Sequence, residues 1–196
     1  SQTLSAGSKT YTLSGSGTPL VRNGTFTYGT STVNYTGTSA TSIASNTTYY
    51  NLGVGISDAN SVTYSSNTSI TTILGITTVA TGDTLAGNSR VDMGSSVDGS
   101  GSLVLNGTIT TWIMYNSNTA FPTGGAINAT LWINAGATGS QTLSARTFGG
   151  FVQLLSYVSD TITFGAGTFN FNGAFSIAEN SNGVNYTVDA ATNDPT

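Results

Sequence analysis

The sequence predicts an all-β fold, and three observations support it. Apolar residues alternate with polar ones in many short stretches, Thr, Tyr, Val and Ile are abundant, and turn dipeptides separate the stretches. Asn-Gly occurs at 23–24, 106–107, 172–173 and 182–183, and Asp-Gly occurs at 98–99. Because Asn-Gly between alternating stretches is the strongest short-range signal of a β-hairpin, the pattern predicts antiparallel pairing.

About ten to twelve short strands are expected, a number and spacing typical of a two-sheet antiparallel sandwich or jelly roll. They fall at 26–28, 33–35, 50–56, 62–64, 103–105, 109–113, 127–133, 162–164, 169–171, 175–177 and 184–188. The stretch 144–158 is assigned as a strand, because Gly149-Gly150 would cost a helix roughly 2 kcal/mol relative to alanine. A β-solenoid is the alternative, but no fixed period runs through residues 60–160.

The N-terminus differs from the rest of the chain. Residues 1–14 are expected to form an N-terminal donor strand, residues 15–20 a Gly- and Pro-containing hinge, and residues 21–196 the β-sandwich body. The donor strand would complete the sheet of a neighbouring subunit and build a head-to-tail polymer. Its expected contact residues are Leu4, Ala6, Lys9, Tyr11 and Leu13, with a bulge near Gly7. The alternative is that this segment is the first strand of its own domain.

Composition excludes several classes of function. The chain has no His and no Cys, which removes the usual catalytic triads, thiol nucleophiles and zinc clusters, so we expect no enzyme and no cofactor. Only four Lys and Arg residues are present, too few to favour nucleic-acid binding. No apolar run is long enough to span a bilayer as a helix. Glycoside hydrolysis needs two carboxylates, and no pair among the eight stands out.

Other features favour an extracellular environment. Thr (36), Ser (26), Gly (25) and Asn (18) make up more than half of the 196 residues. Few side chains titrate between about pH 7 and 2, which suits an acidic or harsh exterior. Seven Asn-x-Ser/Thr sequons are candidate sites for N-linked glycans, where chance would give about four; they are Asn23, Asn34, Asn46, Asn67, Asn106, Asn128 and Asn185.

A few rare residues suggest chemistry. Lys9, the only Lys, could form an isopeptide crosslink with an Asn or Asp, with Glu179, the only Glu, as the nearby acid that shuttles protons. A solvated lysine on an edge strand explains Lys9 more simply. Oxygen ligands for Ca²⁺ are present at Asp83, Asp92 and Asp98, but turn chemistry explains them better than metal binding. Trp112 and Trp132 could form a sugar-stacking platform or pack between sheets.

Two resemblances add to these expectations. The stretch 29–55, GTSTVNYTGTSATSIASNTTYYNLGVG, and the tail 161–196 resemble repeats of large secreted β-rich surface adhesins. The whole chain, in length, sequons, low charge and its strand-plus-hinge N-terminus, resembles archaeal extracellular filament subunits of the thread and bundling-pilus type. That resemblance implies a glycosylated β-sandwich joined by donor-strand complementation, serving adhesion or biofilm. The alternatives are a β-solenoid or stalk segment of a larger secreted adhesin, a carbohydrate-binding jelly-roll module and a viral coat protein.

Overall fold

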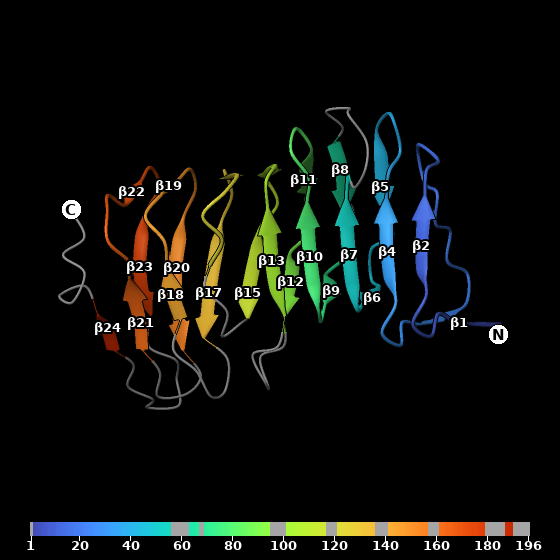
Figure 1. Cartoon of the computed structure of the whole chain (residues 1–196), viewed down its shortest axis with the longest axis horizontal. Coiled ribbons are helices and arrows are strands. Elements are labelled where there is room, and N and C mark those ends of the chain that lie inside the picture. Colours follow the sequence, from blue (N-terminus) through green and yellow to red (C-terminus); the bar gives the residue numbers. More distant parts are fainter. Residues whose placement is uncertain are drawn as a thin grey trace.

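The fold is a β-solenoid (Figure 1). The computed structural model describes residues 2–55, 63–66, 69–94, 101–116, 121–135, 141–156, 161–178 and 187–189. Within these residues the chain forms strands and no helix, and every ladder between strands is parallel. Each coil visits three strand positions in turn, and successive coils stack along the long axis of the molecule.

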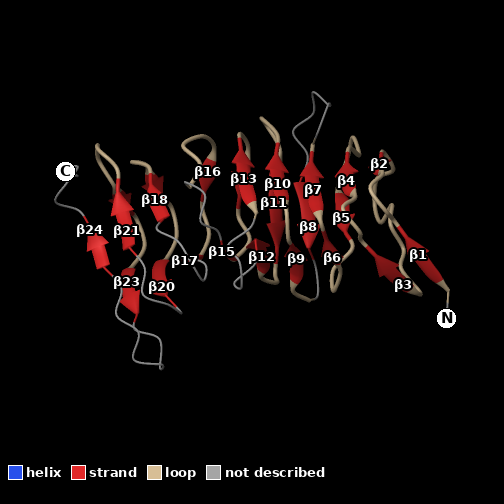
Figure 2. Ribbon diagram, turned by 60° about the horizontal axis from the view of Figure 1, so that its bottom comes forward, coloured by secondary structure: helices blue, strands red, loops and turns tan. Residues whose placement is uncertain are grey.

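The three strand positions define three faces of the solenoid. The first face contains β1 (Thr3–Ser5), β3 (Thr25–Thr27), β6 (Thr48–Tyr49), β9 (Thr71–Ile73), β12 (Val91–Gly94), β15 (Ile113–Asn116), β17 (Leu131–Ala135), β20 (Val152–Ser156) and β23 (Phe175–Ala178). The second face contains β2 (Thr10–Leu13), β4 (Thr32–Tyr35), β7 (Asn51–Val54), β10 (Ile76–Val79), β13 (Ser102–Leu105), β18 (Gln141–Leu143), β21 (Thr161–Phe164) and β24 (Thr187–Asp189). The third face contains β5 (Thr41–Ile43), β8 (Thr63–Ser66), β11 (Thr84–Gly87), β14 (Thr108–Ile109), β16 (Ala126–Ile127), β19 (Thr147–Phe148) and β22 (Asn170–Phe171). Figure 2 shows the coils following one another from β1 and β3 at one end to β23 and β24 at the other.

The expected antiparallel sandwich is therefore wrong, and the solenoid that the sequence left as the alternative is the fold. The error came from the Asn-Gly dipeptides. A type I′ hairpin turn needs positive φ at both central residues, and neither Gly107 nor Gly173 has one. A Cβ atom on Gly107 would instead meet the carbonyl oxygen of Ala80, and one on Gly173 would meet the backbone of Gly150. Glycine stands at these corners because adjacent coils approach closely there.

The length of a coil varies, which hid the repeat from a search for a fixed period. First-face strands from β6 to β23 start at residues 48, 71, 91, 113, 131, 152 and 175, so that one coil takes between 18 and 23 residues. Second-face strands from β4 to β13 start at residues 32, 51, 76 and 102, a spacing of 19 to 26 residues. The extra residues fall between strands in the sequence, and the ladders keep their register.

Side chains of equivalent position stack into columns inside the solenoid. On the third face the column runs through Tyr64, Leu85, Ile109, Ile127 and Phe148, each less than 2% exposed. The first and second faces contribute similar columns, and together these residues form one continuous hydrophobic core. Because an alternating strand points every second residue inward, the same pattern that suggested a sandwich fills the core of a solenoid.

The second face is interrupted between β13 and β18. There the backbone N–H of Phe121 donates to the carbonyl of Thr142 at 3.0 Å, which keeps the coils in contact. The Arg146 guanidinium donates to the carbonyls of Pro122 (2.6 Å) and Gly125 (3.0 Å). It also lies 5.5 Å from the centre of the Phe121 ring. Burial lowers the pKa of Arg146, and these carbonyl contacts stabilise the charge that burial disfavours.

Residues 2–13 form two strands, where one long strand was expected. β1 pairs with β3 and β2 pairs with β4, so both strands belong to the first coil of this chain. A turn at Gly7, with φ of 57°, separates them. Ala6 is 1% exposed, whereas Leu4 is 50% exposed.

Candidate functional site

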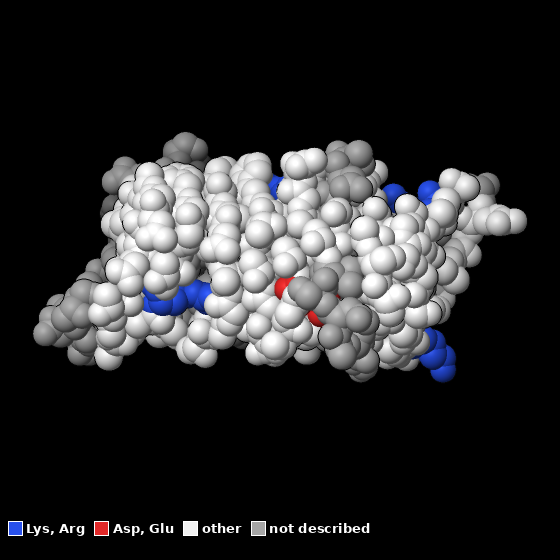
Figure 3. Space-filling view, turned by 90° about the horizontal axis from the view of Figure 1, so that it is seen from above, with Lys and Arg blue, Asp and Glu red and all other residues white. Residues whose placement is uncertain are grey.

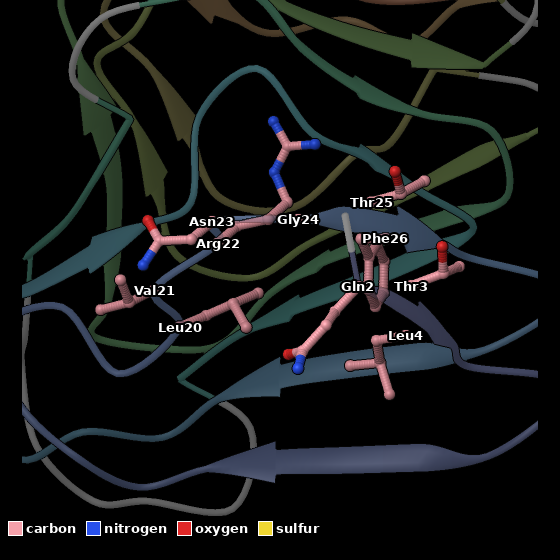
Figure 4. A pocket seen from close by; sticks show the side chains of 10 residues that line it. All are labelled: Gln2, Thr3, Leu4, Leu20, Val21, Arg22, Asn23, Gly24, Thr25 and Phe26. Atoms are coloured by element: carbon pink, nitrogen blue, oxygen red, sulfur yellow. The ribbon is translucent and has the colours of Figure 1, made fainter.

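The N-terminal end of the solenoid exposes apolar side chains around a hollow (Figure 4). An open cavity of about 560 Å³ lies there between the segments 2–4 and 20–26. Leu4 faces Phe26 across the β1–β3 pair, and Val21 is 69% exposed. The hollow is thus the uncovered cross-section of the core at this end.

The last described coils are open in the same way. Phe175 and Ile177 of β23 are 39% and 54% exposed, although they occupy the same columns as Val152 and Leu154, which are fully buried one coil earlier. The ring of Phe171 packs against that of Phe175 at a centroid distance of 4.4 Å. Core columns therefore reach a partly exposed surface at both ends of the described stack.

Edge strands at such ends have backbone groups available for another strand. β2 is the outermost strand of its five-stranded sheet, and β23 is the outermost strand of its seven-stranded sheet. An exposed edge of this kind is a template for pairing. Chemically, the ends can accept a further parallel coil whose inward side chains are apolar.

The residues expected in a donor strand lie in this first coil. Tyr11 and Leu13 face Val33 and Tyr35 in the β2–β4 register, and Leu13 packs against the core. Lys9 is exposed, just before β2, and its carbonyl accepts a hydrogen bond from the N–H of Thr32 at 3.0 Å. Glu179, the carboxylic acid expected to shuttle protons in a Lys9 crosslink, lies outside the described residues.

Most of the described sequons lie on the surface. Asn23, Asn46, Asn106 and Asn128 are exposed, and Asn34 is half-buried on the outer side of β4. Asn46 has a φ of 52°, a left-handed conformation that asparagine tolerates well. Asn67 and Asn185 lie outside the described residues.

The three aspartates considered as Ca²⁺ ligands are not assembled into a described site. Asp83 is 1% exposed and packs against Gly55, whose φ of 73° and missing Cβ leave room for the carboxylate. Asp92 pairs with Arg90 on the outer side of the first face. Asp98 lies outside the described residues. In the described part of the chain, no three His, Cys, Asp or Glu side chains group closely enough to hold a metal ion.

The structure brings Trp112 and Trp132 together on the outer side of the first face. Their ring centroids are 4.8 Å apart and the rings meet edge to face at 74°. The Arg90 guanidinium lies 5.4 Å from the centre of the Trp112 ring. It also donates to both carboxylate oxygens of Asp92, at 2.5 Å from Nε and 2.9 Å from Nη2. We call these four residues the tryptophan cluster.

Sequence reasoning selected the two tryptophans but missed Arg90. The signal was available in the alternation: Arg90 and Asp92 flank Val91, which is 1% exposed, so both must point outward together. Such an ion pair is unusual on this protein, whose surface carries few charged side chains (Figure 3).

Comparisons with protein-family models, with curated proteins and with solved structures give no match. In the described residues, no helix has the length and apolar character needed to cross a membrane. The function is therefore inferred from the fold and the surfaces of the chain itself.

Proposed function

We propose that this chain is a β-solenoid segment of a larger secreted adhesin, where it acts as a stalk. The observation that carries the proposal is the partly exposed core at both ends of the stack, with Leu4 and Val21 at one end and Phe175 and Ile177 at the other. Apolar surface left in water is unfavourable by about 25 cal/mol per Å². Further coils on either end would bury this surface and continue the three ladders.

The shape and surface suit a stalk. Each coil advances a solenoid by about 4.8 Å, the spacing of hydrogen-bonded strands, so a seven-stranded sheet spans about 30 Å. A surface of Ser, Thr and Asn with few charges depends little on pH or salt for its solubility. Glycans on the exposed sequons would add further hydrated cover in an extracellular setting.

The proposal is tested on cells that produce the protein, with antibodies raised against this 196-residue chain. We expect the antibodies to label intact cells and to detect a polypeptide much larger than 19.9 kDa that external protease cleaves. A band near 19.9 kDa that is protected inside the cell would overturn the proposal.

A filament of many copies is the second candidate, favoured by the outermost position of β2 and the hollow beside it. The end of one molecule would stack on the N-terminal coil of the next, a heterologous contact that propagates. Filaments that react with the antibodies and dissociate to a subunit near 19.9 kDa support this candidate.

The intact mass of the denatured subunit also measures glycan attachment and any loss of water or ammonia at a Lys9 crosslink. Assembly after removal of residues 1–14 would contradict a role of that segment in polymerisation.

A further inference from the structure

The outer side of the first face has one site whose residues the core does not require. We propose that the tryptophan cluster of Arg90, Asp92, Trp112 and Trp132 binds a neutral saccharide. The proposal concerns the flank of the solenoid and holds whether or not the chain is a stalk segment.

Both tryptophans point away from the core. Trp132 lies between Leu131 and Ile133, which are fully buried, so alternation directs its side chain outward. Trp112 likewise lies between the buried residues Thr111 and Ile113. Inward columns already fill the solenoid, so the two indoles lie outside the core and pack there against each other and against Arg90.

The cluster concentrates rare residues at one place. It contains the only two tryptophans of the chain and one of its four cations. In the part of the chain that the structure describes, its ion pair is the only one found. The outward row that crosses the cluster runs from Asp92 through Met114 and Trp132 to Gln153, one residue from each successive coil. Arg90 and Trp112 lie on the neighbouring outward row, so the cluster places aromatic rings and hydrogen-bonding groups on two adjacent rows.

This combination matches the chemistry of a sugar ring. A pyranose presents a C–H face, which packs on indole, and a rim of hydroxyls, which exchange hydrogen bonds with planar polar groups such as guanidinium and carboxylate. The Arg90 and Asp92 charges neutralise each other, which favours an uncharged ligand over a phosphate or an acidic sugar. Both indole Nε1 atoms are buried and have no acceptor among the described residues. Binding that turns an indole would expose its N–H to a sugar hydroxyl or an ordered water, which would supply the acceptor that it lacks.

Coil spacing favours a chain of sugars over a single sugar. Successive outward residues in the row from Asp92 to Gln153 are separated by about 4.8 Å, close to the length of one sugar unit. An extended oligosaccharide that lies along the solenoid axis would meet one coil per unit. The site thus predicts higher affinity for a hexasaccharide than for the corresponding monosaccharide.

Tryptophan fluorescence tests the proposal directly, because the only two indoles of the chain are both in the site. The probes are cellohexaose, chitohexaose, α-mannohexaose and their monosaccharides, titrated into the complete chain with excitation selective for tryptophan. We expect a saturable change with at least one hexasaccharide, and a shift of both indole N–H signals in the ¹H–¹⁵N spectrum. No change with any of the three hexasaccharides overturns the proposal.

Variants then assign the binding to the cluster. Trp132→Ala and Asp92→Ala should each weaken hexasaccharide binding by about tenfold or more, because the first removes an aromatic face and the second removes the carboxylate that holds Arg90. Trp132→Phe keeps an aromatic face and should lose less, which guards against a variant that merely unfolds. The matched control is Tyr50→Ala, an exposed aromatic at a corner beside the second face, which should leave affinity unchanged. Equal affinity in folded Trp132→Ala and in the unmodified chain contradicts the assignment.

Discussion

Two tyrosine hydroxyls meet inside the N-terminal coils. The hydroxyl oxygens of Tyr35 and Tyr49 are 2.9 Å apart, and both residues are fully buried. Tyr49 also donates to the carbonyl of Ala44 at 3.0 Å, while the N–H of Ala44 donates to Tyr35 at 3.1 Å. Burial raises the pKa of both phenols. The pair therefore holds its protons in the folded protein under conditions where an unfolded tyrosine loses them.

This pair predicts a loss of stability in alkaline solution. The folded pKa values lie above the unfolded value of about 10, so the unfolded state binds fewer protons above pH 10 and unfolding becomes easier as pH rises. Both phenols should therefore contribute to a decline in the free energy of unfolding above pH 10. Tyr49→Phe should lower the free energy of unfolding at pH 7 by about 1–3 kcal/mol and make the alkaline decline shallower. Urea unfolding at several pH values measures both effects, and equal slopes would show that Tyr49 does not titrate on unfolding.

Alanine substitutions at two glycines distinguish the loss of stability caused by backbone strain from the loss caused by a clash between neighbouring coils. Gly7 and Gly29 have nearly the same φ, 57° and 55°. A Cβ on Gly7 would meet nothing within 4 Å, whereas one on Gly29 would meet the carbonyl oxygen of Gly7 in the neighbouring coil. Gly7→Ala should cost about 1–2 kcal/mol from left-handed strain alone, and Gly29→Ala should cost clearly more. Chemical denaturation compares them, and equal losses would mean that the coils move apart without cost.

At the scale of the strand, one column of the second face contains a polar residue among apolar ones. Thr77 of β10 faces Leu52 on one side and Leu103 on the other. It is fully buried, and its hydroxyl has no partner within the described residues. A buried hydroxyl without a partner is unfavourable by about 1–3 kcal/mol.

Thr77→Val should therefore stabilise the protein, by about 1 kcal/mol, because valine has nearly the same shape without the hydroxyl. Thr78→Val is the matched control: Thr78 is next in sequence and faces outward, so its change should stay within about 0.5 kcal/mol. Thermal unfolding of both variants measures the difference. Destabilisation by Thr77→Val would show that the hydroxyl has an acceptor, such as a bound water.

The sequence predicted most strands but not how they pair. Leu52 and Val54 were correctly expected to share a face of one strand, and both are buried. The alternation across 127–133 was expected to be one strand, but a corner divides it between β16 and β17. Alternation reports only which side chains are buried, and an inward column in a parallel stack has the same period as the inner face of a sandwich. The choice between sandwich and solenoid depended on the glycines of the Asn-Gly dipeptides. In the structure these glycines let adjacent coils approach closely, but in a sequence alone they look the same as the glycines of hairpin turns.

At the scale of the whole molecule, each coil contacts mainly its neighbours, so coils should be removable as units. Deletion of residues 84–107 joins Asp83 to Thr108, which takes the place of Thr84 in the third-face ladder. We expect a folded protein, shorter by one coil, with a denaturant m-value lower by about one-seventh. Circular dichroism and urea unfolding measure the fold and the m-value.

The control deletion removes residues 84–101 and joins Asp83 to Ser102. It places a second-face strand where a third-face strand belongs, so the inward side chains that follow no longer stack on their equivalents in the preceding coils. This variant should fail to fold cooperatively. If both deletions behave alike, the coils are not independent structural units.

Candidate sites were predictable to different degrees. The sequons could be found from their motif, and four of the five described ones are exposed. The tryptophan cluster could not be assembled in advance, because Arg90, Trp112 and Trp132 come from three successive coils and lie together only through the parallel register. The open ends were also hidden, since exposure of Leu4 or Ile177 depends on which strand is outermost.

The direction of the ladders has a mechanical consequence. Hydrogen bonds between coils run along the long axis (Figure 1), so tension between the two ends loads them a few at a time, beginning at an outermost coil. One coil of 18 to 23 residues on the first face would release roughly 60–80 Å of extended chain when it peels away. Such a tether lengthens in steps and dissipates work at each step, and the remaining coils keep their fold and can take the lost coil back when the tension falls.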